Sequence, residues 1–426
     1  MKYVFSMTLA LALLATAPAL ADGRIDVMTQ NQYLGADLGP VITAPDPVAF
    51  NAALVEALEQ IAANNYPARV EQLANLIADR QPELVGLQEM FKFECEDEGV
   101  PTQTPGFDCS YPPIANAFND HLEETLDALA DTYDEVAIVN NLDLTGNIIP
   151  GFPDGLPVDL DFNGLPDITV TVLDRDVILA RGDVATTVVP FGAFCNRPSV
   201  DGCNYDVVAE VPGTPIGDIQ IERGFVGVDA VIDGNVYRFV NTHLEVQFLV
   251  GDPGVPGVVP LGFIQAAQAT ELNGLVAASL QIFPAFDHVI IVGDINSGPT
   301  DGIFQDPAAP NPPFPPGTQF NPPYMQLANG VGLTTLSDPS PLGPLTDAWD
   351  FVKPANEPGF SCCQLADLSN PQSILDERID VIFAIEVKKN VKNVHVLGAE
   401  IQDKTLPGPR LWPSDHGSVA AELRFK

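Results

Sequence analysis

Acidic, amide and imidazole side chains stand at the ends of several apolar segments of this sequence. In the clearest case, the apolar run 288–293 is followed by Asp294 and Asn296, and then by the turn-forming pair Gly298-Pro299. Alternate side chains of an extended chain point to the same face, so Asp294 and Asn296 would project together. Similar polar ends recur at Asn31, Gln88-Glu89, Asn241-Thr242-His243 and Asp415-His416, while Asp380 lies inside a further apolar run.

If these segments are neighbouring strands, their ends form one pocket that holds several carboxylates, two histidines and two carboxamides. Oxygen-rich sites without sulfur suit Mg²⁺ or Mn²⁺. A histidine can accept a proton near neutral pH, and a carboxylate on its other ring nitrogen strengthens it as a base. Together these groups predict a divalent-metal site beside a candidate general base. Taken singly, each strand-end Asp or Asn is more commonly a turn residue that satisfies backbone groups.

Strands dominate the elements that must position these groups. The alternation of apolar residues predicts strands over 24–34, 83–90, 176–184, 288–295, 376–387 and 412–425, and a hairpin over 224–246 that turns at Asp233-Gly234. Helical spacing predicts two helices within 46–81, split by Pro67, and another over 262–280. Stretches rich in Pro, Gly and Asn are expected to be surface loops, at 92–117, 145–170, 190–220, 250–260 and 300–345. Residues 22–426 are therefore expected to form a single α/β domain with long loop insertions.

Six sequence motifs, in this order along the chain, resemble those of the metal-dependent endonuclease/exonuclease/phosphatase superfamily. The family includes pancreatic-type deoxyribonucleases and neutral sphingomyelinases. The motifs are TQNQY, LVGLQEM, VNTHLEV, IVGDINSGP, RIDVIFA and WPSDHGSVAAEL. The first motif departs from the family pattern, because Gln30 stands where an aromatic residue is usual. The resemblance implies a four-layer α/β sandwich, in which two mixed β-sheets pack face to face with helices outside.

The resemblance also implies a divalent-metal-dependent phosphoesterase, in particular a phosphodiesterase, and a role for each strand-end residue. On the metal side, Glu89 would bind Mg²⁺ or Mn²⁺ with help from Asn31, and Asp415 would assist.

The remaining strand-end residues would carry out the chemistry. His416 would be the base that activates water, with Asp380 fixing its tautomer. Asp294 would orient the nucleophile, and Asn296 would hold the nucleophile or a phosphate oxygen. His243 would donate a hydrogen bond to the phosphate or to the leaving group.

Four other residues have weaker sequence contexts. His121 and His288 have no motif around them and are expected to be structural. Arg223 could approach a phosphate, although a simple entry to the hairpin explains it equally well. Trp349 is expected to lie in the core rather than to form a platform for substrate.

The segment 159–167, DLDFNGLPD, resembles the first half of a calcium-binding loop. Its candidate ligands are Asp159, Asp161, Asn163 and Asp167. The acidic residue expected at the twelfth position of such a loop is missing, because Val170 stands there. The segment is either a structural Ca²⁺ site or an acidic turn.

The N-terminus has the three regions of a secretory signal peptide. Lys2 is followed by an apolar stretch, and the sequence Ala19-Leu20-Ala21 suits cleavage after Ala21. Residues 1–21 are therefore expected to be a signal peptide and the mature protein to be secreted or periplasmic. An ordinary hydrophobic N-terminal helix is the alternative.

Six cysteines in an exported chain predict disulfides. They stand at positions 95, 109, 195, 203, 362 and 363. Cys95–Cys109 and Cys195–Cys203 are natural local pairs. Cys362 and Cys363 would then bridge each other, unless the pairing is different.

The charge balance of the chain indicates which classes of substrate it could bind. Lys and Arg total 19 against 57 Asp and Glu, which gives a formal net charge of −38. Because nucleic-acid binding relies on basic contacts to phosphates, nucleic acid is a disfavoured substrate. A phospholipid head group, a nucleotide or a small phosphate ester suits this charge better. The Phe- and Pro-rich segment 311–325 could make peripheral contact with a membrane or could be a rigid surface loop.

No obligate protein partner is expected. The alternative to an enzyme is a noncatalytic secreted binding protein with the same fold.

Overall fold

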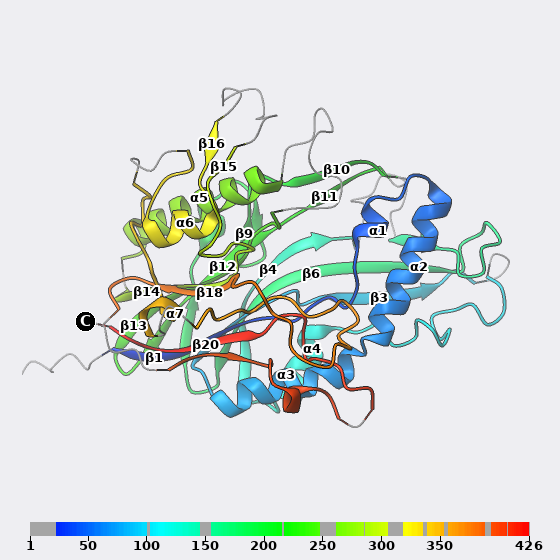
Figure 1. Ribbon diagram of the computed structural model, residues 1–426, viewed down its shortest axis with the longest axis horizontal. Helices are drawn as coiled ribbons and strands as arrows, with labels where there is room; N and C mark the ends of the chain where they lie inside the picture. The colour runs from blue at the N-terminus through cyan, green and yellow to red at the C-terminus, as the bar shows by residue number, and fades with distance from the viewer. Residues whose placement is uncertain are drawn as a thin grey trace, which may run out of the picture.

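The computed structural model consists mainly of two eight-stranded mixed β-sheets (Figure 1). It describes residues 23–99, 103–144, 155–214, 217–247, 261–284, 286–305, 318–334, 339–352, 357–387, 393–406 and 408–425. The expected signal peptide 1–21 and residues 311–317 of the expected membrane-contact segment lie outside the described residues.

The first sheet has the strand order β19-β20-β1-β2-β6-β3, and β4 and β5 also pair with β6. β1 and β2 are parallel, and the other pairs are antiparallel. Its strands are β1 Arg24–Asn31, β2 Leu84–Gln88, β3 Lys92–Asp97, β4 Tyr133–Asp143, β5 Leu156–Val158, β6 Ile168–Arg181, β19 Val394–Leu397 and β20 Ser418–Arg424.

The second sheet has the order β17-β18-β14-β13-β12-β9-β8, and β7 also pairs with β12. β13 and β14 are parallel, so both strands end at the same edge. Its strands are β7 Ala185–Val188, β8 Pro198–Ser199, β9 Gly202–Asn204, β12 Gly224–Ile232, β13 Asn235–His243, β14 His288–Asp294, β17 Thr346–Asp347 and β18 Asp380–Ala384. Two small hairpins lie apart from the large sheets, β10 Ala209–Thr214 with β11 Gly217–Ile221, and β15 Phe304–Gln305 with β16 Gln319–Phe320.

Helices cover the outer face of each sheet. Apolar residues of α3 and α4 pack on β1, β2 and β6 of the first sheet, and those of α5 and α6 pack on β13, β14 and β18 of the second. Figure 1 shows these two helix layers on opposite sides of the sheets. The helices are α1 Gly39–Ile42, α2 Pro47–Ala63, α3 Tyr66–Arg80, α4 His121–Ala128, α5 Leu261–Ile282, α6 Pro323–Asn329 and α7 Ala348–Val352. The expected four-layer α/β sandwich is confirmed.

The core lies between the two sheets. It is filled by side chains that alternate along their strands, such as Val27 and Leu84 from the first sheet and Val228, Phe239 and Ile290 from the second. All five are fully buried, and each buried side chain of this size stabilises the fold by about 1.5–3 kcal/mol. Among the described residues, no helix has the length and apolar character needed to cross a bilayer.

One buried amide joins the two sheets close to their polar edge. The Nδ2 of Asn241 on β13 donates to the backbone oxygens of Leu87, at 2.9 Å, and Val177, at 3.0 Å. Its Oδ1 accepts from Gln88 Nε2 at 2.6 Å. Asn241 therefore ties the second sheet to β2 and β6 of the first, which fixes how the strand ends of the two sheets face each other.

Several predicted loops contain regular structure. β3 lies within 92–117, β8 to β10 and most of β11 lie within 190–220, and β15, β16 and α6 lie within 300–345. The predicted strand over 176–184 begins earlier, at Ile168, because the Thr- and Val-rich residues before it favour an extended chain. As expected, Pro67 lies in the first turn of α3, where its missing N–H costs no helical hydrogen bond.

Candidate active site

The strand pairing sets three predicted site residues side by side. In the second sheet, His243 at the end of β13 is opposite Asp294 at the end of β14. On the other side of β14, Asp294 is opposite Asp380, the first residue of β18. The side chains of all three residues are buried. The register of three strands, rather than a flexible loop, therefore places these groups in one row.

His416 comes to this row from the loop before β20. Its Nδ1 lies 2.8 Å from Asp380 Oδ2, and because a carboxylate only accepts, Nδ1 carries the proton. Its Nε2 lies 3.8 Å from Asp294 Oδ2 and 4.0 Å from Asp415 Oδ1. The predicted pair of His416 and Asp380 is therefore in contact, with Nε2 facing the other carboxylates.

The surrounding carboxylates govern the protonation of His416. Burial disfavours the charged imidazolium, but Asp380, Asp415 and Asp294 together outweigh it and hold the pKa of His416 well above its usual value. With only protein groups around it, the imidazole is therefore charged at neutral pH. A charged imidazole cannot act as a base until some of the negative charge around it is offset.

Asn31 links the ends of β1, β2 and β14. Its Nδ2 donates to Glu89 Oε1 and to Asp294 Oδ2, at 3.1 Å in each case. Its Oδ1 accepts from the backbone N–H of Tyr33 at 2.9 Å. Glu89 also accepts from the backbone N–H of Leu34 at 2.8 Å. Asn31 thus holds Glu89 and Asp294 at fixed positions in the site.

Two site residues have left-handed backbone conformations where their strands end. Glu89 has φ 56° just after β2, and Asn296 has φ 49° two residues after β14. Non-glycine residues in this region cost on the order of 1–3 kcal/mol, and such conformations concentrate at functional sites. The sharp turns direct both side chains back over the edge of the sheets.

The acidic groups of the site are closely crowded. Burial raises the pKa of Asp294 to about 7, and the charge of Asp380 adds to the effect, against the lowering by His416. Burial raises the pKa of Asp415 to about 6, with Glu89 adding to it. One oxygen of Asp380, Oδ1, is buried without a hydrogen-bond partner. Such a set of oxygens with excess negative charge suits a hard divalent cation, so the residues fit the predicted Mg²⁺ or Mn²⁺.

A second set of three side chains could also approach a cation. Ligand atoms of Asp294, Asp380 and His416 lie within 4.8 Å of one another. The Nδ1 of His416 is already bonded to Asp380, so only its Nε2 could face a cation in this set. Metal binding by Glu89 and Asp415 stays a prediction.

His243 is held in one tautomer by Arg223. The Nη1 of Arg223 lies 3.0 Å from His243 Nδ1. Because a guanidinium only donates, Nδ1 must accept and the proton of the neutral ring stays on Nε2. Burial, with the charges of Arg223 and His416, holds the pKa of His243 well below its usual value. His243 is therefore neutral, and its Nε2–H lies 3.6 Å from an acceptor, Asp294 Oδ2. The Nδ2 of Asn296, at 3.2 Å, is itself a donor and cannot accept this proton.

Three buried carboxylates around Arg223 were not predicted from the sequence. Arg223 Nη1 lies 3.4 Å from Asp174 Oδ2, and its Nε lies 3.8 Å from Glu245 Oε2. Burial raises the pKa of Asp174 to about 7, and burial with the charge of Asp174 raises that of Asp176 well above its usual value. Asp174 and Asp176 are two residues apart on apolar β6, and that spacing was the available signal. This set fixes the guanidinium that orients His243.

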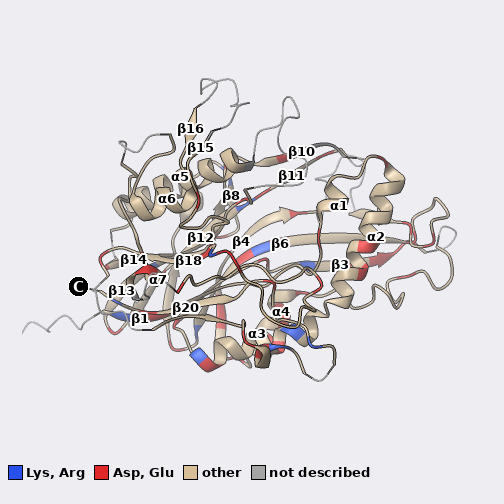
Figure 2. Cartoon of the chain, in the orientation of Figure 1, with Lys and Arg blue, Asp and Glu red and all other residues tan. Residues whose placement is uncertain are grey.

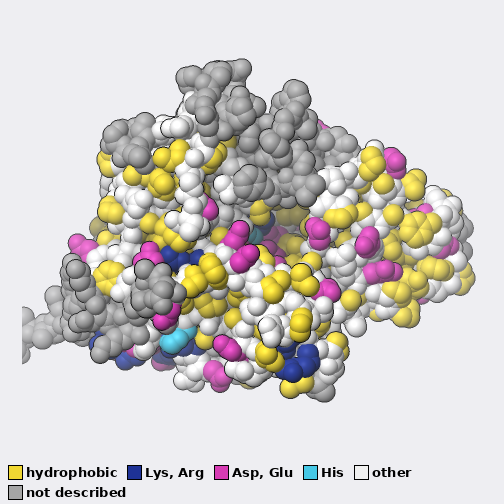
Figure 3. All heavy atoms as spheres, viewed as in Figure 1, with side chains coloured by type: hydrophobic (Ala, Val, Ile, Leu, Met, Phe, Trp, Pro, Cys, Tyr) yellow, Lys and Arg dark blue, Asp and Glu magenta, His cyan; other side chains and the backbone are white. Residues whose placement is uncertain are grey.

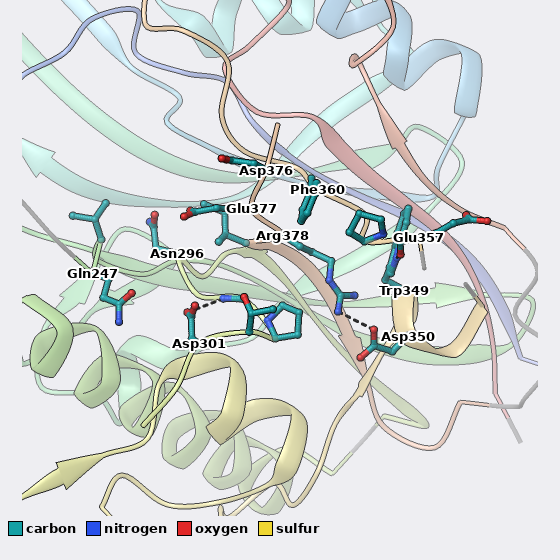
Figure 4. A pocket seen from close by; sticks show the side chains of 16 residues that line it. Gln247, Asn296, Asp301, Trp349, Asp350, Glu357, Phe360, Asp376, Glu377 and Arg378 are labelled. Carbon is teal, nitrogen blue, oxygen red and sulfur yellow. Dashed lines mark hydrogen bonds and ion pairs between the residues drawn. The ribbon is translucent and has the colours of Figure 1, made fainter. Parts of the chain in front are cut away.

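A cavity of about 720 Å³ lies beside the catalytic groups, and Asn296 lines it (Figure 4). Figure 3 shows a hollow in the middle of the corresponding face with acidic side chains around it. The acidic residues of the cavity wall are Asp301, Asp350, Glu357, Asp376 and Glu377, whereas Arg378 is the one basic residue among its described lining residues.

Arg378 is occupied by acidic neighbours. Its guanidinium is 2.8 Å from both Asp347 and Asp350. Figure 2 likewise shows basic residues scattered singly over the described elements. The cavity is therefore electronegative.

The other predicted residues lie outside this site. His121 is buried and stacks on Tyr66 at 3.5 Å, and His288 stacks on Phe425 at 4.1 Å, so both are structural as expected. Trp349 is largely buried and packs in the core, although it also reaches the cavity wall.

The predicted calcium loop connects β5 and β6. Ligand atoms of Asp159, Asp161 and Asp167 lie within 4.8 Å of one another. Backbone N–H groups already donate to these carboxylates, including that of Asn163 to Asp159 at 3.1 Å and that of Leu160 to Asp167 at 2.9 Å. These bonds are those of a well-formed acidic turn, and calcium binding stays a prediction.

Comparison with known proteins gives matches to solved structures, whereas no family model and no curated protein matches the chain. One match is a mannosyl-6-phosphatase of Bacteroides thetaiotaomicron, with 14% identity over 94% of this chain and 100% of the other, at a TM-score of 0.46. Another is an endonuclease/exonuclease/phosphatase family protein of the same bacterium, with 15% identity over 95% and 99%, at a TM-score of 0.45. The catalytic domain of human Nocturnin with bound sulfate matches with 16% identity over 95% and 97%, at a TM-score of 0.42.

The crowding of buried acids predicts how the stability of the metal-free protein depends on pH. The folded state keeps protons on Asp294, Asp415 and His416 at pH values where the unfolded chain has released them, so stability falls as pH rises. Between about pH 6.5 and pH 8 we expect a loss on the order of 2–3 kcal/mol in the free energy of unfolding, whereas below this range the low pKa of His243 opposes the loss. Urea unfolding in the presence of a chelator measures it.

Adding Mg²⁺ is expected to restore more stability at the higher pH, because protons compete with the metal for the carboxylates. The variant Asp294→Asn serves as the control and should show a shallower dependence on pH. Equal stability of the metal-free wild type at both pH values would contradict the described crowding.

Proposed function

We propose that this protein is a divalent-metal-dependent phosphoesterase of the endonuclease/exonuclease/phosphatase superfamily, and that it cleaves phosphodiesters. The observation that carries the proposal is the contact between His416 and Asp380 at a strand edge that also holds Asp294, Asn296 and His243. A base with its orienting acid, next to a neutral N–H donor, is the equipment that hydrolysis of a phosphate ester requires.

Each group has one task in this mechanism. His416 Nε2 accepts a proton from the attacking water, while Asp380 stabilises the charge that then forms on the ring. Asp294 accepts a hydrogen bond from the water, and this bond directs a lone pair of the water oxygen at phosphorus. The Nε2–H of His243 and the amide of Asn296 donate to phosphate oxygens, on which negative charge grows during attack.

Glu89 and Asp415 would hold Mg²⁺ or Mn²⁺. When bound, the cation would offset the charge on the phosphate oxygens and on the carboxylates around His416. Asn31 keeps Glu89 in place through its hydrogen bond.

For the substrate, we propose a phosphodiester with a cationic or neutral substituent. The cavity beside Asn296 is lined by acidic groups. Burial is the main cause that raises the pKa of Glu377, and the charges of Asp376 and Asp301 raise it further. A polyanion such as nucleic acid would be repelled from such a surface. A quaternary ammonium group would be attracted by the acids and by the aromatic ring of Phe360, which is 39% exposed. A zwitterionic phospholipid head group combines both features.

We also propose that the chain is exported. The pairs Cys95–Cys109 and Cys195–Cys203 are disulfides, as expected from the sequence, and Cys362 bridges Cys363. Disulfides are typical of oxidising compartments and agree with the predicted signal peptide. Contact with a membrane surface stays a prediction.

The first test replaces the base. We expect His416→Ala to lower kcat for the Mg²⁺-dependent hydrolysis of bis-p-nitrophenyl phosphate by about 10²–10⁴-fold, because the variant loses the imidazole that accepts the proton of the attacking water. His395, which is exposed on β19, offers a matched control, and His395→Ala should retain wild-type kcat. If wild type and His416→Ala are equally inactive with every divalent metal, a noncatalytic binding protein is the better description.

The second test concerns the cavity. We expect the double variant Asp376→Asn/Glu377→Gln to raise KM for p-nitrophenyl phosphorylcholine by about tenfold, since the loss of a favourable charge contact of about 1.4 kcal/mol has this effect. Bis-p-nitrophenyl phosphate is also a phosphodiester anion but carries no cation, and it releases the same product, so its KM should change less than about twofold. Parallel changes for both substrates would rule out recognition of a cation in the cavity.

A further inference from the structure

The disulfide between Cys362 and Cys363 lies against the catalytic base. Each sulfur and a ring nitrogen of His416 lie within 4.8 Å of one another. Cys362 is 2% exposed, whereas Cys363 is open to solvent. Small reagents can therefore reach the disulfide from the side of Cys363. The disulfide itself lies within 4.8 Å of a ring nitrogen of His416.

The segment that carries this disulfide also joins the two halves of the catalytic pair. The hydroxyl of Ser361 accepts from the backbone N–H of Asp380 at 3.1 Å. The backbone oxygen of Ser361 accepts from Gly417 N at 2.7 Å, and Gln364 N donates to the backbone oxygen of Asp415 at 2.8 Å. Residues 361–364 are therefore bonded to β18 on one side and to the His416 loop on the other, which fixes where the two sulfurs lie.

We propose that reduction of the Cys362–Cys363 disulfide creates a second metal site, in which both cysteine sulfurs and His416 bind a thiophilic divalent cation such as Zn²⁺. The predicted effect of the metal on catalysis rests on the role of His416 proposed above. The predicted binding of the metal does not. Two thiolates and one imidazole are a ligand set that zinc accepts, with a fourth position left for water. Mg²⁺ prefers oxygen donors and would remain on the acidic side of the site.

The chemistry is a two-electron reduction followed by binding. A dithiol reductant attacks one sulfur, the Cys362–Cys363 bond breaks, and the reductant leaves as its own cyclic disulfide. The two protons of the reductant end on the cysteine thiols. Binding of Zn²⁺ then releases both protons, because thiolates are the ligands. The lone pair of a coordinated imidazole is no longer available to water, so zinc switches the reduced enzyme off while the oxidised enzyme is spared.

The direct test uses Co²⁺ as a spectroscopic substitute for zinc. The whole protein is reduced with a phosphine, which binds metals weakly, desalted without oxygen, and titrated with Co²⁺ in the presence of Mg²⁺. We expect one equivalent to bind with the charge-transfer absorption of thiolate ligands, and no such absorption for the oxidised protein. In parallel, one equivalent of Zn²⁺ should lower the rate of the reduced enzyme by about 10²-fold or more, as expected for loss of a general base.

Matched variants separate this site from the other two disulfides. Cys195→Ser/Cys203→Ser should retain the cobalt absorption, whereas Cys362→Ser/Cys363→Ser should lose it together with inhibition by zinc. Both His416→Ala and the bulkier His416→Gln should weaken the absorption or shift it. Absorption that is identical with and without His416, or its absence from a protein whose thiols are shown to be free by mass spectrometry, would overturn the proposal. Because the absorption is measured without substrate, this test of the second metal site does not depend on whether the protein is a phosphoesterase.

Discussion

Carboxylates crowded around one imidazole are the constraint on which the rest of the site depends. Asp294, Asp380 and Asp415 surround His416, and burial raises the pKa of Asp294 and of Asp415 towards neutrality. Like charges at such distances repel strongly in a poorly solvated site, so the arrangement persists only if the fold enforces it. The same field keeps a proton on His416. Both the stability of the site and the proposed action of His416 as a base therefore depend on a balancing positive charge.

The fold supplies this enforcement through strand register and buried hydrogen bonds. Asp294 lies between His243 and Asp380 because β14 pairs with β13 on one side and β18 on the other. The amide of Asn241 fixes one sheet on the other, and that of Asn31 fixes Asp294 relative to Glu89 on the first sheet. These links are buried and rigid, so the geometry exists before any ligand binds, which is the condition for electrostatic catalysis.

Much of this site could be predicted from the sequence because its residues are local endpoints of strongly patterned strands. Asp294 and Asn296 follow an apolar run that forms β14, although Asn296 itself has a left-handed rather than an extended backbone. The contact of Arg223 with Asp174 could not be predicted, since it depends on how the hairpin packs against β6 of the other sheet. The position of Cys362 near His416 depends likewise on a segment without periodicity, bonded to two distant parts of the chain. Predicted loops such as 92–117 proved partly extended because pairing with a long neighbouring strand outweighs local turn signals.

The proposed site requires a divalent cation that offsets the charge of the crowded carboxylates. Crystals grown with Mn²⁺ and measured near the manganese absorption edge locate such an ion directly by anomalous scattering. We expect one strong anomalous peak within about 2.0–2.2 Å of carboxylate oxygens of Glu89 and Asp415, with the hydrogen bond between His416 and Asp380 intact. A peak in which His416 Nε2 is itself a ligand, or an active enzyme without any manganese at this edge of the sheets, would contradict it.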